Sequence, residues 1–383
     1  MPDKDIEKLL EHDVRVRTVS RMMPVSGPLP SALRNQIAKA LDDRMRARNL
    51  SQKDVAEAIG ASQNYVSTLL SNAASMPEAT QDRLWRDINN MLEREARAEE
   101  NQRPDGFVLM RVPERLIALA THLSERADMA IAYGPAGIGK TTTIKAIAAE
   151  ISTAIAITAG YDTRTPKKLL RVIYAAVASR RKRGKADLFV EEVIEKLRMP
   201  EKVKTRSLLI IDQAHLLLHS AGIWQLLMEL HDRAQCSILL VGTRDLQLHV
   251  ATDDDPEFGQ LSSRVGMRIE LAPELVGSLR GGAKRGAKRC FSVADIRKLF
   301  AGSKLKLHPD AAQMLCEIAN TRRGTLRRVK RLFDWAEVAA REAGAGTITT
   351  QHLQSAAALV EEDAELPSGL EDGREVGAVV AAG

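Results

Sequence analysis

Short apolar runs alternate with helical stretches in the middle of the chain. Five of these runs are candidate strands, because they are short, apolar and separated by segments with helical periodicity. They occupy residues 129–133, 154–158, 208–211, 237–241 and 267–271. Strands that alternate with helices form a parallel sheet with helices on both faces. The pattern therefore predicts an α/β domain.

Helical periodicity continues on both sides of this domain. Upstream it occupies residues 33–70 and 77–100, and the break Arg103-Pro-Asp-Gly106 follows. Downstream the β signal stops after Pro273, and helical patterns occupy 293–300, 309–320, 326–342 and 350–361. We expect a flexible arm (1–30), a helical domain with a linker helix (31–100), the α/β core (105–273), a helical C-terminal domain (274–360) and an acidic disordered tail (361–383).

Composition and charge narrow the class of protein. The 383 residues fit two or three domains, and the low aromatic fraction of 3% favours helix-rich packing. The net charge is +6, and residues 361–383 hold seven acidic residues and one basic residue, which leaves +12 on residues 1–360. A basic folded part favours a polyanionic partner.

The three cysteines, Cys236, Cys290 and Cys316, have no paired or metal-ligand spacing. We therefore expect neither a disulfide framework nor a zinc site, and a cytoplasmic location. The first thirty residues lack an apolar signal region, and the chain has no run of 18 apolar residues. Export and membrane insertion are not expected.

A phosphate-binding loop follows the first predicted strand. Residues 134–141 match G-x-x-x-x-G-K-[ST] at each fixed position, with a helical run directly after them. A chance glycine-rich turn is the alternative, and the flanking strand and helix argue against it. In such a loop, backbone N–H groups surround the phosphates of ATP, the lysine reaches the β- and γ-phosphates, and the hydroxyl binds Mg²⁺. The expected nucleotide-binding residues are Gly134, Pro135, Ala136, Gly137, Ile138, Gly139, Lys140, Thr141 and Thr142.

The third predicted strand ends at Asp212, where a carboxylate would reach the metal ion beside Thr141. Gln213 follows it, whereas ATPases of this architecture usually carry a glutamate there. A glutamine orients water but accepts no proton, and general-base assistance contributes about 10²–10⁴ in rate. This favours slow hydrolysis or the use of ATP as a switch, and an engineered substitution is a further alternative. His215 is interpreted as a residue flanking the strand end.

Residues 50–69 have the spacing of a helix-turn-helix motif, with Ala56 where two helices would cross and Gly60 in the turn. Ser51 and Ser62 are candidate N-caps. The second helix would present Gln63, Asn64, Tyr65 and Ser67 to DNA. A helical hairpin used for protein contacts is the alternative.

Two glycine-containing basic runs are candidate sites for the DNA backbone. Charge runs are usually solvated faces, but repeated in every subunit of a ring or filament they would line a phosphate backbone. The first run is favoured over the second, which spans residues 280–289. The basic residues of the first run are Arg180, Arg181, Lys182, Arg183 and Lys185.

The loop, Asp212, Thr243, Arg264 and Gly324-x-x-Arg327 follow one another in the order found in AAA+ ATPases, and residues 105–355 resemble such a core with its helical lid. The resemblance implies that Thr243 is sensor 1, that Arg264 is an arginine finger for a neighbouring subunit, and that Arg327 is sensor 2. It therefore implies oligomerisation.

Residues 35–355 also resemble the family of the Mu-type phage B protein, the ATPase that selects targets for DNA transposition. The local similarity lies in residues 210–216, 239–243, 263–264 and 324–328. The resemblance implies an ATPase that assembles with ATP and Mg²⁺ on double-stranded DNA, with little sequence preference, and recruits a transposase in a bacterial cell or phage-infected host. The alternatives are a helix-turn-helix transcriptional regulator with a nucleotide-gated switch domain, and a loader or remodeller ATPase.

Overall fold

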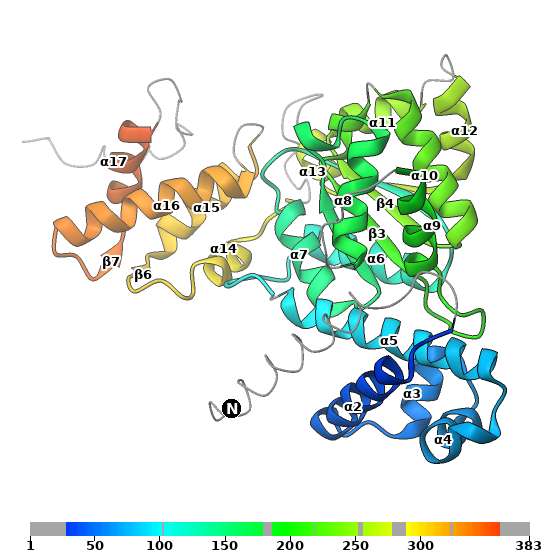
Figure 1. The fold of residues 1–383 in the computed structure, drawn as a ribbon. Coiled ribbons are helices and arrows are strands. Elements are labelled where there is room, and N and C mark those ends of the chain that lie inside the picture. Colours follow the sequence, from blue (N-terminus) through cyan, green and yellow to red (C-terminus); the bar gives the residue numbers. More distant parts are fainter. Residues whose placement is uncertain are drawn as a thin grey trace, which may run out of the picture. The chain divides into compact units, whose positions relative to one another are not determined.

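The computed structural model of this chain describes residues 28–101, 103–178, 186–218, 220–251, 256–277, 289–321 and 325–360 (Figure 1). They form two compact units. The first comprises residues up to 105, 115–134 and 140–271, and the second comprises 106–114, 135–139 and the residues from 272 onward. Most of the predicted arm and the whole predicted acidic tail lie outside the described residues.

A five-stranded sheet with the order β2-β3-β4-β1-β5 forms the centre of the first unit, and all of its strand pairs are parallel. All five strands are predicted by the sequence. β5 begins two residues earlier than expected, and β3 and β4 each extend one residue further. The strands are β1 (Met129–Tyr133), β2 (Ala154–Thr158), β3 (Leu208–Asp212), β4 (Ser237–Gly242) and β5 (Val265–Glu270).

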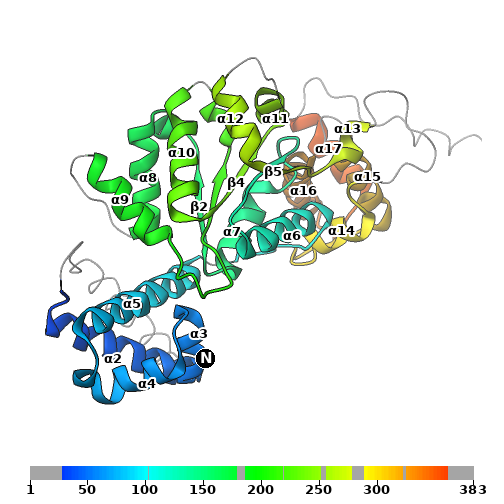
Figure 2. The same ribbon diagram turned by 90° about the vertical axis from the view of Figure 1, so that its right-hand side faces the viewer.

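Helices cover both faces of this sheet. α8 (Pro166–Ala178), α9 (Ala186–Leu197) and α10 (Ala221–Ala234) lie on one face, and α6 (Arg111–Glu125) and α7 (Lys140–Glu150) lie on the other (Figure 2). Every residue of β3 and β4 is buried, because both strand faces meet helices. α11 (Arg244–Ala251) and α12 (Pro256–Arg264) connect β4 to β5. The fold is α/β, with a phosphate-loop core and helical regions before and after it.

Four helices precede the sheet: α2 (Ser31–Arg48), α3 (Gln52–Ile59), α4 (Gln63–Asn72) and α5 (Glu78–Glu100). The Ser51 and Ser62 side chains cap α3 and α4 by accepting backbone hydrogen bonds, as predicted. Gly60 ends α3 in the left-handed conformation, with φ 65°. Val66 and Leu69 lie in the core of these four helices.

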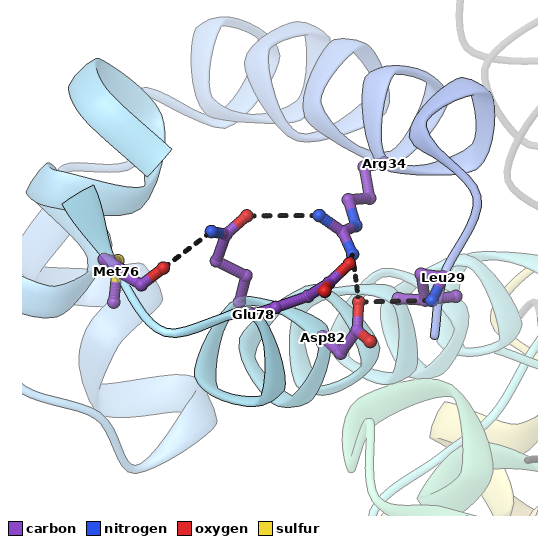
Figure 3. Close-up of polar contacts among 6 residues, drawn as sticks. Leu29, Arg34, Met76, Glu78 and Asp82 are labelled. Carbon is purple, nitrogen blue, oxygen red and sulfur yellow. Dashed lines mark hydrogen bonds and ion pairs between the residues drawn. The ribbon is translucent and has the colours of Figure 1, made fainter. Parts of the chain in front are cut away.

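A polar clamp ties α2 to α5 (Figure 3). The Arg34 guanidinium donates to Asp82 Oδ1 at 2.7 Å, to Gln81 Oε1 at 3.1 Å and to Glu78 Oε1 at 3.2 Å. Asp82 Oδ1 also accepts from the backbone N–H of Leu29 at 3.2 Å. The clamp fixes the start of α2 against the first turns of α5.

α5 also contacts the sheet domain. Glu93 accepts from Lys196 on α9 at 2.8 Å, and Asn101 donates to the Ala148 carbonyl on α7 at 3.3 Å. Arg94 is buried beside Met199, and burial lowers its pKa to about 10. The four helices are therefore packed against the nucleotide core through a partly charged interface.

The second unit contains the helices after the sheet, and all of them except α13 match predicted helical segments. They are α13 (Pro273–Gly277), α14 (Val293–Leu299), α15 (Pro309–Ala319), α16 (Thr325–Glu342) and α17 (Thr350–Val360). The prediction that strands end after Pro273 is wrong. β6 (Lys306–Leu307) and β7 (Thr347–Ile348) form a parallel pair. Two-residue strands are too short to show a periodic pattern.

Among the described helices, none combines the length and the apolar character that crossing a membrane requires.

Candidate nucleotide-binding site

The phosphate-binding loop joins β1 to α7. Gly134 donates to the Gly242 carbonyl at the end of β4 at 3.2 Å, and the Lys140 ammonium donates to the Gly134 carbonyl at 2.9 Å. Gly137 and Gly139 have φ values of 77° and 96°, a region that side chains rarely adopt. The backbone of the loop therefore requires glycine at positions 137 and 139.

Thr141 and Asp212, the two candidate Mg²⁺ ligands, lie together. Thr141 Oγ1 donates to Asp212 Oδ2 at 2.6 Å, and Asp212 Oδ1 accepts from the backbone N–H of Gln213 at 2.9 Å. Asp212 is only 2% exposed. A hydroxyl and a carboxylate beside a phosphate-binding lysine are suitable oxygen ligands for Mg²⁺, which binds one or two protein groups and completes its shell with phosphate and water.

Gln213 has a left-handed backbone with φ 57° and an exposed side chain at the end of β3. Its amide is accessible to water but cannot take up a proton. Two residues further, the Nδ1 atom of His215 is buried and has no hydrogen-bond partner within the described residues. Burial and the charge of Lys140 lower the pKa of His215, which favours a neutral imidazole. The sequence interpretation of His215 as a flanking residue missed this environment.

Thr243 follows β4, next to the strand that carries Asp212. The two strands are parallel neighbours, so both residues lie at the same edge of the sheet. The Thr243 hydroxyl donates to Asp245 Oδ2 at 3.1 Å. Gly242 is closely packed, because an added Cβ would lie 3.0 Å from Leu246 Cδ2 and 3.4 Å from the backbone nitrogen of His215.

Arg264 lies at the amino-terminal ends of the strands, whereas the phosphate-binding loop lies at their carboxyl-terminal ends. It ends α12 directly before β5, and the start of β5 is paired with the start of β1. The loop follows the other end of β1. The Arg264 guanidinium forms an ion pair with Asp232 at 3.0 Å, and both side chains are partly exposed. Arg264 therefore lies on the side of the sheet away from the candidate nucleotide site of this chain.

Arg327 lies in the first turn of α16 and is exposed. A Cβ added to Gly137 would lie 2.5 Å from Thr325 Oγ1 and 3.2 Å from Arg327 Cβ. The first turn of α16, which holds both residues, therefore lies beside the middle of the phosphate-binding loop. Gly324, which belongs to the same predicted motif, lies outside the described residues.

The predicted DNA-binding residues differ in their surroundings. Gln63, Asn64 and Tyr65 are exposed at the start of α4, and Ser67 is half-buried. The first basic run, with Arg180, Arg181, Lys182, Arg183 and Lys185, lies outside the described residues. The second run does so as well, except for Arg289.

The sequence reasoning missed an aromatic residue between cations after β2. Tyr161 is 78% exposed, with Arg164 and Lys168 5.6 and 5.1 Å from its ring centroid. The buried Thr163 hydroxyl holds this turn by accepting from Gly160 N–H at 2.8 Å. The signal is present in the sequence as basic residues three and seven positions after a tyrosine, a spacing that a search for continuous basic runs does not detect.

Comparison with known protein families finds a similar domain within the core. A family profile described as AAA domain matches residues 121–249. No curated protein matches the chain. Three similar solved structures are the Aeropyrum pernix ORC1 protein in complex with DNA (18% identity, 67% of each chain covered, TM-score 0.44), the Aeropyrum pernix ORC2 protein in ADPNP–ADP complexes (16%, 70% of this chain and 72% of that chain, 0.49) and the Thermotoga maritima RuvB Holliday junction branch migration motor (19%, 67% and 72%, 0.40).

The matched segment contains the phosphate-binding loop, Asp212 and Thr243. The α/β domain is a P-loop core of the AAA+ type, as the sequence predicts.

Proposed function

We propose that this protein is an ATP-dependent, DNA-binding regulator of DNA transposition. In this proposal it oligomerises on double-stranded DNA with ATP and Mg²⁺, selects target DNA, and recruits or stimulates a transposase. The observation that carries the nucleotide part is the contact between Thr141 and Asp212 beside the loop of Lys140. The transposition part is supported by the resemblance of the motifs to the family of the Mu-type phage B protein.

ATP would be held by the backbone of residues 134–139 and by Lys140, with Mg²⁺ on Thr141 and Asp212. Bound Mg²⁺ would neutralise phosphate charge. Gln213 would orient the attacking water without deprotonating it, so we expect slow hydrolysis. Thr243 would respond to the γ-phosphate from the end of the neighbouring strand.

Oligomerisation is supported by the position of Arg264. Because it lies at the sheet edge opposite the phosphate-binding loop, its guanidinium would complete the site of a neighbouring subunit. The Asp232 ion pair holds it in the single chain, and exposed ion pairs of this kind contribute only about 0–1 kcal/mol. A γ-phosphate next door would therefore replace Asp232 at little cost.

DNA binding is supported by the excess of basic residues and by Tyr161 with its two cations. Lys168 and Arg164 suit phosphate groups, and the exposed ring suits a base or a sugar. These contacts carry no sequence preference, which fits target selection along arbitrary DNA.

A transcriptional regulator with a nucleotide-gated switch is the second candidate. Asn64 and Gln63, exposed at the capped start of α4, are side chains that read adenine in the major groove. This candidate would have one preferred operator and a fixed small oligomer.

Electron microscopy and co-sedimentation with DNA of increasing length, with and without ATP, test the proposal. We expect ATP-dependent rings or filaments that lengthen with the DNA and pellet with unrelated sequences equally well. Binding to one operator as a small oligomer would support the second candidate. A stimulation assay with a purified transposase tests the final step, and no stimulation would contradict it.

A further inference from the structure

The N-terminal helices lack the positive charge that DNA binding requires. Residues 28–101 contain ten Lys and Arg residues against eleven Asp and Glu residues, although the chain as a whole is basic. α4, which would enter the groove, contains no charged residue. Since phosphate contacts supply most of the affinity of non-specific DNA binding, these helices alone form an incomplete DNA-binding surface.

Five of the ten cations of these helices also form ion pairs with carboxylates. Figure 3 shows this for Arg34, which contacts Glu78 and Asp82. Arg94 is buried against the core. The other ion-paired cations are Arg44 with Glu95 and Glu99, Arg46 with Asp42, Arg48 with Glu99, and Lys53 with Glu57.

A basic loop of the core lies against the turn between α3 and α4. An added Cβ at Gly60 would lie 3.0 Å from Val203 Cγ2 and 3.2 Å from Lys202 Cβ. This loop, residues 198–206, connects α9 to β3. It carries four basic residues, Arg198, Lys202, Lys204 and Arg206, against one acidic residue, Glu201.

The backbone of this loop directs its two lysines outward. Val203 is 7% exposed, and Lys202 and Lys204 on either side of it are exposed. Within the described residues, neither lysine forms an ion pair. Gln63, the first residue of α4, is three residues from Gly60, so the lysines lie beside the end of α4 that presents Gln63 and Asn64.

We propose that Lys202 and Lys204 of the core complete the DNA-binding surface of the α3–α4 pair by binding phosphates beside the groove that α4 enters. This inference rests on the proposed binding of DNA by α4. It assigns the phosphate contacts of the N-terminal helices to the ATPase core, so DNA binding by α4 depends on the core being packed against it.

The test is DNA binding by the full chain over a range of salt concentrations. We expect Lys202→Ala with Lys204→Ala to weaken binding about tenfold at 0.15 M salt and to reduce the salt slope by about two, one for each phosphate contact. Lys304→Ala with Lys306→Ala is the matched control, because these exposed lysines flank Leu305 in the same way. Unchanged affinity and slope in the first variant would overturn the inference.

A second arm separates this inference from the proposed function. Asn64→Ala with Tyr65→Ala should also weaken binding. If only this pair weakens binding, α4 contacts DNA and the role of the lysines is refuted. If only the lysine pair does, the lysines act apart from α4, and the joint surface is refuted. If neither does, the proposed DNA contact of α4 fails as well.

A cross-linking measurement addresses proximity directly. Cys236, Cys290 and Cys316 are buried, so a single surface cysteine can be labelled selectively. Lys202→Cys carrying a photo-crosslinker should cross-link to DNA, and Lys304→Cys should do so at least tenfold less. Equal yields from the two positions would count against the inference.

Discussion

Thr141 donates a 2.6 Å hydrogen bond to Asp212, 71 residues away in the sequence. The bond joins the first turn of α7 to the last residue of β3. The two oxygens therefore lie side by side, where one cation could bind both of them. A substitution that removes the charge of Asp212 would therefore affect α7 as well as β3.

Replacing Lys140 with Ala should abolish ATP binding and ATP-dependent assembly, because the β- and γ-phosphates lose their main cation. Binding of a fluorescent ATP analogue and co-sedimentation with DNA are the measurements. Lys145→Ala is the control, since Lys145 is an exposed lysine one turn further along α7. Normal assembly of the Lys140 variant would refute the proposed switch.

Replacing Gln213 with Glu should raise ATP turnover at least tenfold with nearly unchanged nucleotide affinity. The substitution supplies a general base at an exposed position that does not touch the phosphate-binding loop. Gln213→Ala provides the control, and should not raise turnover. If Gln213→Glu has no effect either, another residue activates the water, and His215 is the first to examine because of its unpartnered Nδ1 atom.

Most of the core could be predicted from the sequence, because fully buried parallel strands give short continuous apolar runs. The phosphate-binding loop was predictable for a similar reason: its glycines and lysine are fixed by local geometry. Asp212 followed from the end of a strand. The capping residues Ser51 and Ser62 were also predictable, since a cap depends on three or four consecutive residues.

Contacts between distant segments could not be predicted where no sequence motif marks them. The approach of Gly60 to Val203 joins segments more than 140 residues apart, and no local pattern encodes it. The Arg264–Asp232 ion pair is of the same kind. The β6–β7 pair is too short to give an alternating pattern, and its two strands are 40 residues apart.

Replacing Asp87 with Asn should stabilise the protein at neutral pH. Burial raises the pKa of Asp87 from 3.8 to about 6, so the unfolded chain ionises this carboxyl before the folded protein does. The folded state therefore loses stability as the pH rises from about 4 to about 6, and Asn removes this loss. We expect a gain of about 1–3 kcal/mol at pH 8 and little change at pH 4, measured by denaturant unfolding. An equal gain at both pH values would contradict the argument.

Replacing Tyr161 with Ala should weaken DNA binding about tenfold without changing nucleotide affinity. Without the ring, Arg164 and Lys168 would lose the cation–π contacts that order them, and with these contacts their position beside the phosphates of the duplex. Fluorescence anisotropy with labelled DNA is the measurement. Leu248→Ala serves as the control, because Leu248 is another exposed apolar residue. Unaltered DNA binding by the Tyr161 variant would exclude this loop from the DNA-binding surface.

The final prediction compares the two partners of one ion pair. Arg264→Ala should leave ATP affinity of the single subunit close to normal, because Arg264 lies at the sheet edge away from its own phosphate-binding loop. It should prevent ATP-dependent assembly and any DNA-stimulated hydrolysis, since the γ-phosphate of the neighbouring subunit would lose a guanidinium.

Asp232→Ala is the matched variant, because it breaks the same 3.0 Å contact but leaves the guanidinium available. If the ion pair only stabilises the fold, the two variants should behave alike. If Arg264 acts on the neighbour, the Asp232 variant should assemble at least as well as the parent, and the Arg264 variant should not assemble. Nucleotide binding by fluorescence and co-sedimentation with DNA measure the two properties separately. Normal assembly of Arg264→Ala would make Arg264 a surface charge, and Arg268, whose guanidinium contacts Ser262 Oγ at 2.5 Å, would be the next candidate.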